Sequence, residues 1–320
     1  MTPSMHQRDA LLATVYRSGF ADCLHYGSVV VVDPGGKVCF SLGAPERQTY
    51  GRSANKLMQA VAMLRLGLSV TSEQLALTTA SHSGGEQHLD VVCSILADAG
   101  LTQEHLQNVA APPFGRRESE EFLRRDQTPS ALTMNCSGKH ASMLATCVTC
   151  SWGLETYLDP AHPLQVHITE TIAEFTGETT DGIGVDGCGA PAHQVSVVGL
   201  AQSLRVVALA SDTTPEGRVA DAIRRHRVLV GGHDRDVTEF LLAAPGWIGK
   251  DGADGLMVLA SPEGFSVAAK VGDGADRPRV PVALAALEHA GLVLPSLPPA
   301  IRRPPVFGGG KPVGELVALG

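Results

Sequence analysis

Two hairpin patterns, one near each end of the chain, constrain its fold more than any other sequence feature. Near the N-terminus, the apolar run at residues 27–33 is followed by a Pro-Gly-Gly turn and a second strand pattern at residues 37–42. Near the C-terminus, residues 255–260 and 265–271 flank a Ser-Pro-Glu-Gly turn. Strand-like segments joined by short turns rich in glycine or proline are typical of antiparallel hairpins. Both ends of the chain are therefore expected to supply strands.

Helical patterns fill most of the sequence between the two hairpins. Apolar residues recur at helical spacing from Ala54 to about Leu68, and a second helix from Glu86 to Ala99 should end at Gly100. The same patterns indicate further helices, and one last strand, at residues 137–149, 164–175, 195–210, 217–229, 281–290 and 314–319. We therefore expect an α/β fold, in which an antiparallel sheet built from N- and C-terminal strands is packed with helices and joined to a helical lobe.

The length of the chain suits one large domain or two closely joined ones, since it has 320 residues. The sequence contains no clean linker, low-complexity tract or internal repeat. We predict a single catalytic domain over residues 1–320. Two lobes are possible within it: a sheet lobe of residues 1–60 with 245–320, and a mainly helical lobe of residues 61–244.

Composition and charge argue against two classes of partner. The formal net charge is −8 and no basic stripe is present, which argues against nucleic-acid binding. No apolar run reaches the roughly 18 residues that span a membrane, and residues 1–15 lack a signal-peptide pattern. We therefore expect a cytoplasmic protein with neither a membrane nor a nucleic-acid partner. In a reducing compartment, the seven cysteines should be free thiols or metal ligands.

Ser53 and Lys56 form a Ser-x-x-Lys motif at the start of the first predicted helix. Residues three apart share a helix face, so Lys56 should reach the Ser53 hydroxyl. Backbone N–H groups at a helix start favour developing negative charge, and a hydroxyl becomes a good nucleophile once a base takes its proton. Lysine serves as that base when burial or a neighbouring cation lowers its pKa. On spacing alone, a solvated helix face remains the simpler interpretation.

A serine-containing loop and a strand lysine are further candidates. The loop at residues 80–86 carries Ser81 and His82 beside paired glycines, which allow close backbone approach to a ligand. The same loop also fits a simple cap of the following helix. Lys270 lies on the small-residue face of a strand in the second hairpin. It is placed either to border a cleft or to protect an edge strand.

Two cysteines in separate segments are candidate zinc ligands. Cys136 and Lys139 lie three apart at a predicted helix start, and Cys188 lies in a glycine-rich bend. Thiolates from two such loops suit zinc, but two are fewer than a structural zinc site needs. Ordinary burial of both cysteines is the alternative interpretation.

The order of these segments is more specific than any one of them. A Ser-x-x-Lys motif after an N-terminal hairpin, a helical lobe with a serine loop, and a lysine on a C-terminal strand match the plan of serine β-lactamases and penicillin-binding proteins. Glutaminases share that layout.

A series of short motifs runs along nearly the whole chain. They are Arg17-Ser18-Gly19, His25-x-Gly27-Ser28, Arg52-Ser53-x-x-Lys56 with Gln59-Ala60, Ala80-Ser81-His82-Ser83, Asn135-Cys136-Ser137-Gly138-Lys139-His140-Ala141, Asp186-Gly187-Cys188-x-Ala190-Pro191, Gly252-Ala253-Asp254-Gly255, and Lys270-x-x-Asp273-Gly274-x-x-Arg277. Together they resemble the asparaginase II-like family, the rhizobial thermolabile type of L-asparaginase.

This resemblance implies a homodimeric enzyme with a serine β-lactamase- and glutaminase-like fold, which hydrolyses L-asparagine to L-aspartate and ammonia. It also implies two Ser–Lys pairs, Ser53 with Lys56 and Ser81 with Lys270. A zinc site, one per chain, is implied at three ligands completed by water: Cys136, Lys139 and Cys188. A lysine bound to zinc must be neutral, which the ion itself would enforce.

The mechanism that follows has Ser53 as nucleophile and Lys56 as its base, while Ser81 and Lys270 relay protons or hold the oxyanion. The reverse order, with Ser81 as nucleophile, remains open. Asp186 is expected to bind the substrate α-amino group, or else to shape the turn before the second cysteine. The same motifs suggest three further substrate-binding residues, namely Arg52, His82 and Gly274. The alternatives are a glutaminase or another penicillin-recognising serine amidohydrolase, and a catalytically inactive binding or regulatory homologue.

Overall fold

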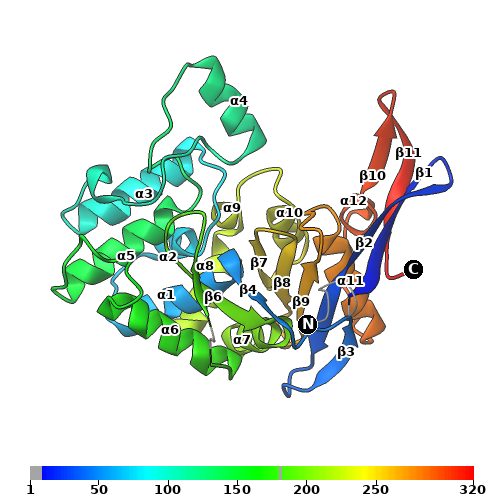
Figure 1. The fold of residues 1–320 in the computed structure, drawn as a ribbon, viewed down its shortest axis with the longest axis horizontal. Coiled ribbons are helices and arrows are strands. Elements are labelled where there is room, and N and C mark those ends of the chain that lie inside the picture. Colours follow the sequence, from blue (N-terminus) through cyan, green and yellow to red (C-terminus); the bar gives the residue numbers. More distant parts are fainter. Residues whose placement is uncertain (1–8, 180–181) are drawn as a thin grey trace, which may run out of the picture. The chain divides into compact units, whose positions relative to one another are not determined.

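The computed structural model describes residues 9–179 and 182–320, which form two compact units (Figure 1). The first unit contains the chain up to Ala54, together with Val195–Leu209 and Glu239–Gly320. The second unit contains Asn55–Gln194 and Ala210–Thr238. Residues 1–8, part of the segment that lacks a signal-peptide pattern, lie outside the described residues.

The first unit is built on an antiparallel sheet to which both ends of the chain contribute. Its strands follow the order β10-β11-β1-β2-β9-β8-β7, and β3 pairs with β2. They are β1 (Ala10–Arg17), β2 (Phe20–Val32), β3 (Val38–Leu42), β7 (Ile248–Gly252), β8 (Leu256–Ala260), β9 (Ser266–Val271), β10 (Pro305–Gly308) and β11 (Lys311–Ala318). Strand β1 pairs with β11 and β2 pairs with β9, both antiparallel. The predicted sheet of N- and C-terminal strands is therefore confirmed.

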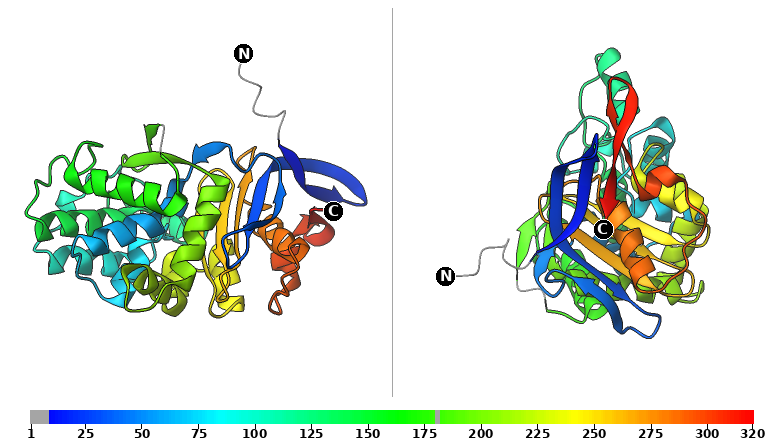
Figure 2. Two further views of the ribbon diagram at one scale, coloured as in Figure 1. Left: turned by 90° about the horizontal axis from the view of Figure 1, so that it is seen from below. Right: turned by 90° about the vertical axis from the view of Figure 1, so that its right-hand side faces the viewer.

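Helices cover both faces of the central strands of this sheet. All four residues of Val29–Val32 are fully buried, although successive side chains of a strand point to opposite faces. Helices α7 (Val197–Leu209) and α11 (Arg279–His289) both pack on β2 and β9, and Figure 2 shows them on opposite sides of the sheet. This double cover explains the continuous valine run. Short elements of the unit are β4 (Gln48–Tyr50) and α12 (Pro299–Arg302), and the 3-10 helix η2 (Arg52–Asn55) begins in this unit and ends in the second.

The second unit is mainly helical. Its helices are α1 (Lys56–Arg65), α2 (Ser72–Thr78), α3 (Glu86–Asp98), η3 (Gln103–His105), α4 (Arg116–Arg124), α5 (Ser137–Thr149), α6 (Pro163–Thr176), α8 (Pro215–Arg225) and α9 (Arg227–Val230). Strands β5 (Ile183–Val185) and β6 (Pro191–Ser196) pair antiparallel, and both β6 and α10 (Asp236–Ala243) cross the boundary between the units in sequence.

Helix α2 lies at the centre of the second unit and positions the serine loop. It packs against α3, α5, α8 and α9. Thr71 and Gln74 form a reciprocal capping box at its N-terminus, which fixes where the helix begins. A Cβ added at Gly138 would lie 2.7 Å from the Leu77 carbonyl oxygen, so glycine lets α5 approach α2 closely. The loop that follows α2 therefore leaves a rigid helix.

Most predicted helices are present, with one division. Helix α5 has the predicted bounds, whereas the helix predicted over residues 217–229 is divided into α8 and α9. Strands β1, β7 and β10 were not expected from the sequence pattern. Within the part of the chain that the structure describes, no helix is long and apolar enough to cross a membrane.

Candidate active site

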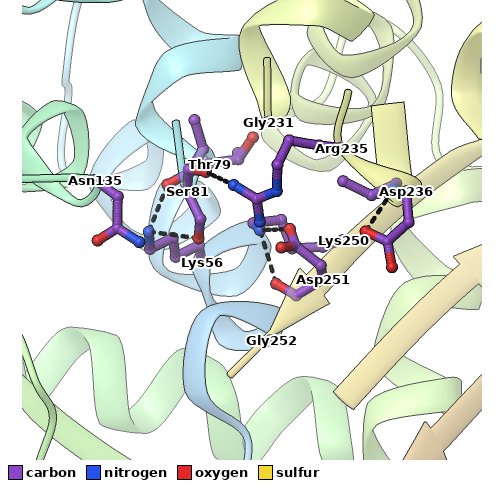
Figure 3. Close-up of polar contacts among 12 residues, drawn as sticks. Lys56, Thr79, Ser81, Asn135, Gly231, Arg235, Asp236, Lys250, Asp251 and Gly252 are labelled. Atoms are coloured by element: carbon purple, nitrogen blue, oxygen red, sulfur yellow. Dashed lines mark hydrogen bonds and ion pairs between the residues drawn. The ribbon is translucent and has the colours of Figure 1, made fainter. Parts of the chain in front are cut away.

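Lys56 is the centre of a buried polar cluster in the second unit. It is the first residue of α1 and is only 1% exposed. Its Nζ donates to the Ser81 hydroxyl at 3.2 Å, to the Cys136 sulfur at 3.2 Å and to the Ala80 carbonyl (Figure 3 shows the contact with Ser81). The amine of Lys56 is thus held against the side chain of Ser81, which lies 25 residues further along the chain.

The segment that carries Ser81 is held on both sides by backbone hydrogen bonds. The N–H groups of Ser81 and Ser83 donate to the carbonyls of Val230 and Gly231, at 3.1 and 2.7 Å. The N–H of His82, between them, donates to the Asn135 carbonyl at 3.1 Å. Successive N–H groups thus donate to opposite sides, as they do in an extended strand between two neighbouring segments. The Ser81 hydroxyl is therefore presented from a fixed backbone.

Arg235 adds a cation to the Ser81 segment. Its Nη1 donates to the Ser81 carbonyl at 3.1 Å, as Figure 3 shows. Its guanidinium also lies 4.5 Å from the centre of the Phe114 ring. No sequence pattern points to this residue, because 154 positions separate it from Ser81. It is a site residue that sequence reasoning missed.

His82, which we expected to bind substrate, is fully buried. Its Nε2 lies 2.9 Å from the Ser137 hydroxyl, and its ring stacks on His88 with the ring centres 5.4 Å apart. Burial holds the pKa of His82 well below its ordinary value. The ring therefore lies neutral behind the loop and ties it to the start of α5. Its expected contact with substrate stays a prediction.

Cys136, Lys139 and Cys188 come together in the second unit, and all three are buried. Lys139 Nζ donates to the Cys188 sulfur at 3.2 Å. A hydrogen bond between the two cysteines lowers the pKa of Cys188 and raises that of Cys136. Burial opposes the charge on Lys139, but the nearby Cys188, Cys136 and Asp186 leave its pKa raised.

This donor set fits zinc, which binds sulfur and nitrogen ligands in proteins. Two thiols supply sulfur, and Lys139 supplies a nitrogen beside one of them. Among residues 9–179 and 182–320, no group of three His, Cys, Asp or Glu side chains is arranged to hold a metal. A zinc site here therefore depends on Lys139. Zinc would have to displace the proton that this amine carries.

Asp186 shapes the bend that presents Cys188. Its N–H donates to the Ala190 carbonyl at 2.9 Å, and its carbonyl accepts from Gly189 at 2.8 Å. Its carboxylate accepts from the N–H of Gly187 at 2.8 Å. These bonds match the turn-shaping alternative given above for Asp186. Binding of the substrate α-amino group by Asp186 stays a prediction.

A second charged cluster lies in the first unit around Asp254. Its carboxylate pairs with Nη1 of Arg52, and its carbonyl accepts from Nζ of Lys270. Gly274, a predicted substrate-binding residue, lies against the Asp254 backbone. Asp254 belongs to the Gly-Ala-Asp-Gly motif at residues 252–255, for which no role was predicted.

A buried histidine, His25, is a further feature of this unit. His25 lies 2.6 Å from the Asp273 carboxylate through Nδ1, and its Nε2 accepts from Nε of Arg277 at 3.1 Å. The imidazole thus links the two polar residues that follow Lys270 to strand β2. Together, these bonds fix the chain that leaves β9.

The two predicted Ser–Lys pairs each join a residue of one unit to a residue of the other. Half-buried Ser53 lies in η2 in the first unit, and Lys56 opens α1 in the second. Ser81 lies in the second unit and Lys270 in the first. Both pairings therefore stay predictions, whereas the Lys56–Ser81 contact lies within one unit.

The buried His193 predicts a loss of stability in acid. Its Nε2 bonds the Thr169 hydroxyl at 2.8 Å, its Nδ1 has no hydrogen-bond partner among the described residues, and burial lowers its pKa from 6.5 to about 4. The neutral ring therefore stabilises the fold fully above about pH 6.5, and this contribution is lost as the pH falls through about 4. We expect His193→Gln to reduce the acid-induced fall in the free energy of unfolding by on the order of 3 kcal/mol. Urea titrations at pH 7 and pH 4 measure the free energy of unfolding of the wild type and of His193→Gln. An equal fall in that free energy in the two proteins would contradict the prediction.

Comparisons with known proteins give a family and several solved structures. The sequence profile of L-asparaginase II matches residues 13–318. A β-lactamase from Mycobacterium bovis has a TM-score of 0.45 at 14% identity, covering 83% of this chain and 95% of that one. EstCE1, a hydrolase with promiscuous acyltransferase activity, has a TM-score of 0.41 at 13% identity, with coverages of 81% and 93%. A Bacillus glutaminase has a TM-score of 0.34 at 13% identity, with coverages of 82% and 88%. No curated protein sequence matches the chain significantly.

Proposed function

Because the chain belongs to the L-asparaginase II family, we propose that it hydrolyses L-asparagine to L-aspartate and ammonia. The family match supports an amidohydrolase. The observation that carries the proposed chemistry is the buried contact between Lys56 Nζ and Ser81 Oγ at 3.2 Å. A hydroxyl held against an amine on a fixed backbone is the arrangement that nucleophilic catalysis requires.

In the proposed mechanism, Ser81 is the nucleophile and Lys56 is its base. The unprotonated amine takes the hydroxyl proton while Ser81 Oγ attacks the side-chain amide carbon of asparagine. The C–N bond then breaks, Lys56 returns the proton to the leaving nitrogen, and ammonia departs. Water hydrolyses the resulting ester with Lys56 again acting as base, which restores Ser81 and releases aspartate. This order is the reverse of the one expected in the sequence analysis, where Ser53 is the nucleophile.

Ser53 and Lys270 are proposed to assist the reaction from the first unit. Lys270 is a suitable proton acceptor, since burial lowers its pKa. Arg52 and Gly274 are proposed to bind substrate beside it, and Asp186 to contact the substrate α-amino group. The competing assignment has Ser53 as the nucleophile. It predicts that Ser53→Ala loses more activity than Ser81→Ala.

We also propose one zinc ion per chain, held by Cys136, Lys139 and Cys188 with water. When bound, zinc would supply positive charge that orders a polar substrate beside the serines. The mechanism above does not depend on it. The support is the buried set of two sulfurs and one amine.

Metal analysis tests the zinc proposal directly. Protein purified without added zinc should contain about one zinc per chain, and Cys188→Ser should lose most of it because a thiolate ligand is removed. Cys147→Ser is the matched control, since Cys147 is also buried but lies outside this cluster. A zinc-free, fully active enzyme would remove zinc from the proposal.

Side-by-side assays of asparagine, glutamine and nitrocefin test the substrate. We expect ammonia release from asparagine to dominate, because that is the reaction of the family. Faster turnover of glutamine would favour a glutaminase, and nitrocefin hydrolysis would favour a penicillin-recognising enzyme. No turnover of any substrate by folded protein would favour an inactive homologue.

We further propose a cytoplasmic homodimer. The dimer rests on the family resemblance, and size-exclusion chromatography with light scattering tests it. A monomer at micromolar concentration would contradict the assembly without affecting the chemistry proposed for Ser81.

A further inference from the structure

The turn between β7 and β8 has a left-handed backbone at Asp254. Its φ is 61°, in the left-handed region, and Gly255 follows with φ 73°. Arg52, the ion-pair partner of Asp254, has φ 45°. An Asp-Gly pair adopts this backbone readily in a hairpin turn, whereas a left-handed backbone costs an arginine about 1–2 kcal/mol, and strained residues concentrate at functional sites. Arg52 is therefore the member of the ion pair that is held in an unfavourable conformation.

The turn is fixed by close packing against the end of β9. The N–H of Val271 donates to the Gly255 carbonyl at 3.0 Å. A Cβ added at Gly255 would lie 2.8 Å from Cβ of Val271 and 2.9 Å from the Ala275 carbonyl oxygen. A side chain at position 255 would therefore force Val271 or the Ala275 backbone to move. This close packing fixes the backbone of the turn that carries Asp254.

Asp254 contacts two expected site residues through different atoms. Its carbonyl accepts from Lys270 Nζ, which also donates to the Val271 carbonyl at 3.2 Å. Its carboxylate accepts from Arg52. The first contact uses the backbone and the second uses the side chain, so one residue orients both cations.

The charged groups around Lys270 have opposite effects on it. Burial lowers the pKa of Lys270, Asp254 and Asp273 raise it, and Arg52 and Arg47 lower it. Without the Asp254 charge, only Asp273 would oppose the effect of Arg52 and Arg47 on the pKa of Lys270. The Lys270 amine would then lose its proton at a lower pH.

We propose that Asp254 is a positioning residue, which holds Lys270 through its carbonyl and Arg52, the neighbour of Ser53, through its carboxylate. The inference rests on the proposed function in assigning catalytic work to the residues it orients. Asp254 is 61% exposed at its side chain, and exposed ion pairs contribute little to stability. Loss of the Asp254 charge should therefore change the titration of Lys270 and kcat, and leave the free energy of unfolding nearly unchanged.

The test compares Asp254→Asn with Asp22→Asn. Asparagine tolerates a left-handed backbone, so the first variant removes the charge and keeps the turn. Asp22 forms a half-exposed ion pair with Arg17 in the same unit and is the matched control. We measure the titration of Lys270 by its pH-dependent reactivity toward an amine-acylating reagent, with the modified peptide quantified by mass spectrometry. We also measure kcat and KM for asparagine across pH.

In Asp254→Asn, the Lys270 titration should move to lower pH, and kcat should fall about 10- to 100-fold as Arg52 loses its alignment. The acid limb of the kcat profile should move to lower pH with the amine. A purely structural role would reduce the active fraction without moving either titration. Asp254→Glu, which retains the charge, should keep Lys270 near its wild-type titration even if turnover falls.

An unchanged Lys270 titration in Asp254→Asn, with kcat equal to that of Asp22→Asn, would overturn the inference. If Asp254→Asn unfolds, the same comparison made with Asp254→Glu and Arg52→Gln decides it, because loss of the Arg52 charge should raise the pH of the Lys270 titration. If the titration moves as expected but no protein hydrolyses asparagine, the positioning role stands and the proposed function fails.

Discussion

Replacing Ser81 by alanine should lower kcat for asparagine by roughly 10⁶-fold, since loss of the nucleophile of a serine hydrolase has an effect of that order. The substitution removes one oxygen and leaves the backbone bonds of the 81–83 segment intact. The Lys56 amine keeps its contacts with Ala80 and Cys136. Thermal stability should therefore change little, and the loss should lie in ammonia release measured by steady-state kinetics.

Two serine variants make this prediction specific. Ser83→Ala lies in the same loop, and its hydroxyl donates to the Gly231 carbonyl at 2.9 Å, so its loss should cost about 1 kcal/mol of stability but little activity. Ser53→Ala should retain a measurable rate if Ser53 only assists. If Ser53→Ala is inactive while Ser81→Ala turns over, Ser53 is the nucleophile.

Replacing Lys56 by methionine should produce a loss of similar size. Methionine keeps most of the buried side-chain volume but removes the amine that faces the Ser81 hydroxyl at 3.2 Å. Because a nucleophile and its base act as a unit, the double variant with Ser81→Ala should be no slower than either single variant. Steady-state kinetics on the three proteins give this comparison.

The Lys56 result needs a check on folding, because the residue is buried and touches three groups. A circular dichroism melt close to that of the wild type establishes that the methionine variant is folded. Losses that multiply in the double variant would show that the two residues act independently. A folded, fully active Lys56→Met would remove lysine from the base role.

The sheet could be predicted from its hairpins, but not all of its strands could be. The turns after residues 33 and 260 are local signals, and the valine run of β2 marks a strand buried on both faces. Strand β1 escaped prediction because its pairing with β2 has irregularities between Leu11 and Ala13 and between Val15 and Tyr16. Such bulges interrupt the alternation on which strand prediction depends.

Candidate residues for the site could be named from the sequence, but the contacts among them could not. Helical spacing pointed Lys56 at Ser53, whereas the packing of α1 beside the loop after α2 brings its amine to Ser81. That contact depends on tertiary packing, which residue spacing does not encode. The cysteines could be paired only through the family resemblance, and Asp254 acts partly through a backbone carbonyl, for which side-chain chemistry gives no signal.

Locating the acyl group during turnover tests the central claim most directly. Enzyme mixed with excess asparagine is quenched in acid within milliseconds, digested with pepsin and analysed by mass spectrometry. The account predicts an aspartyl ester on the peptide that contains Ser81, absent from Ser81→Ala and present in Ser53→Ala. An ester on Ser53 would contradict it.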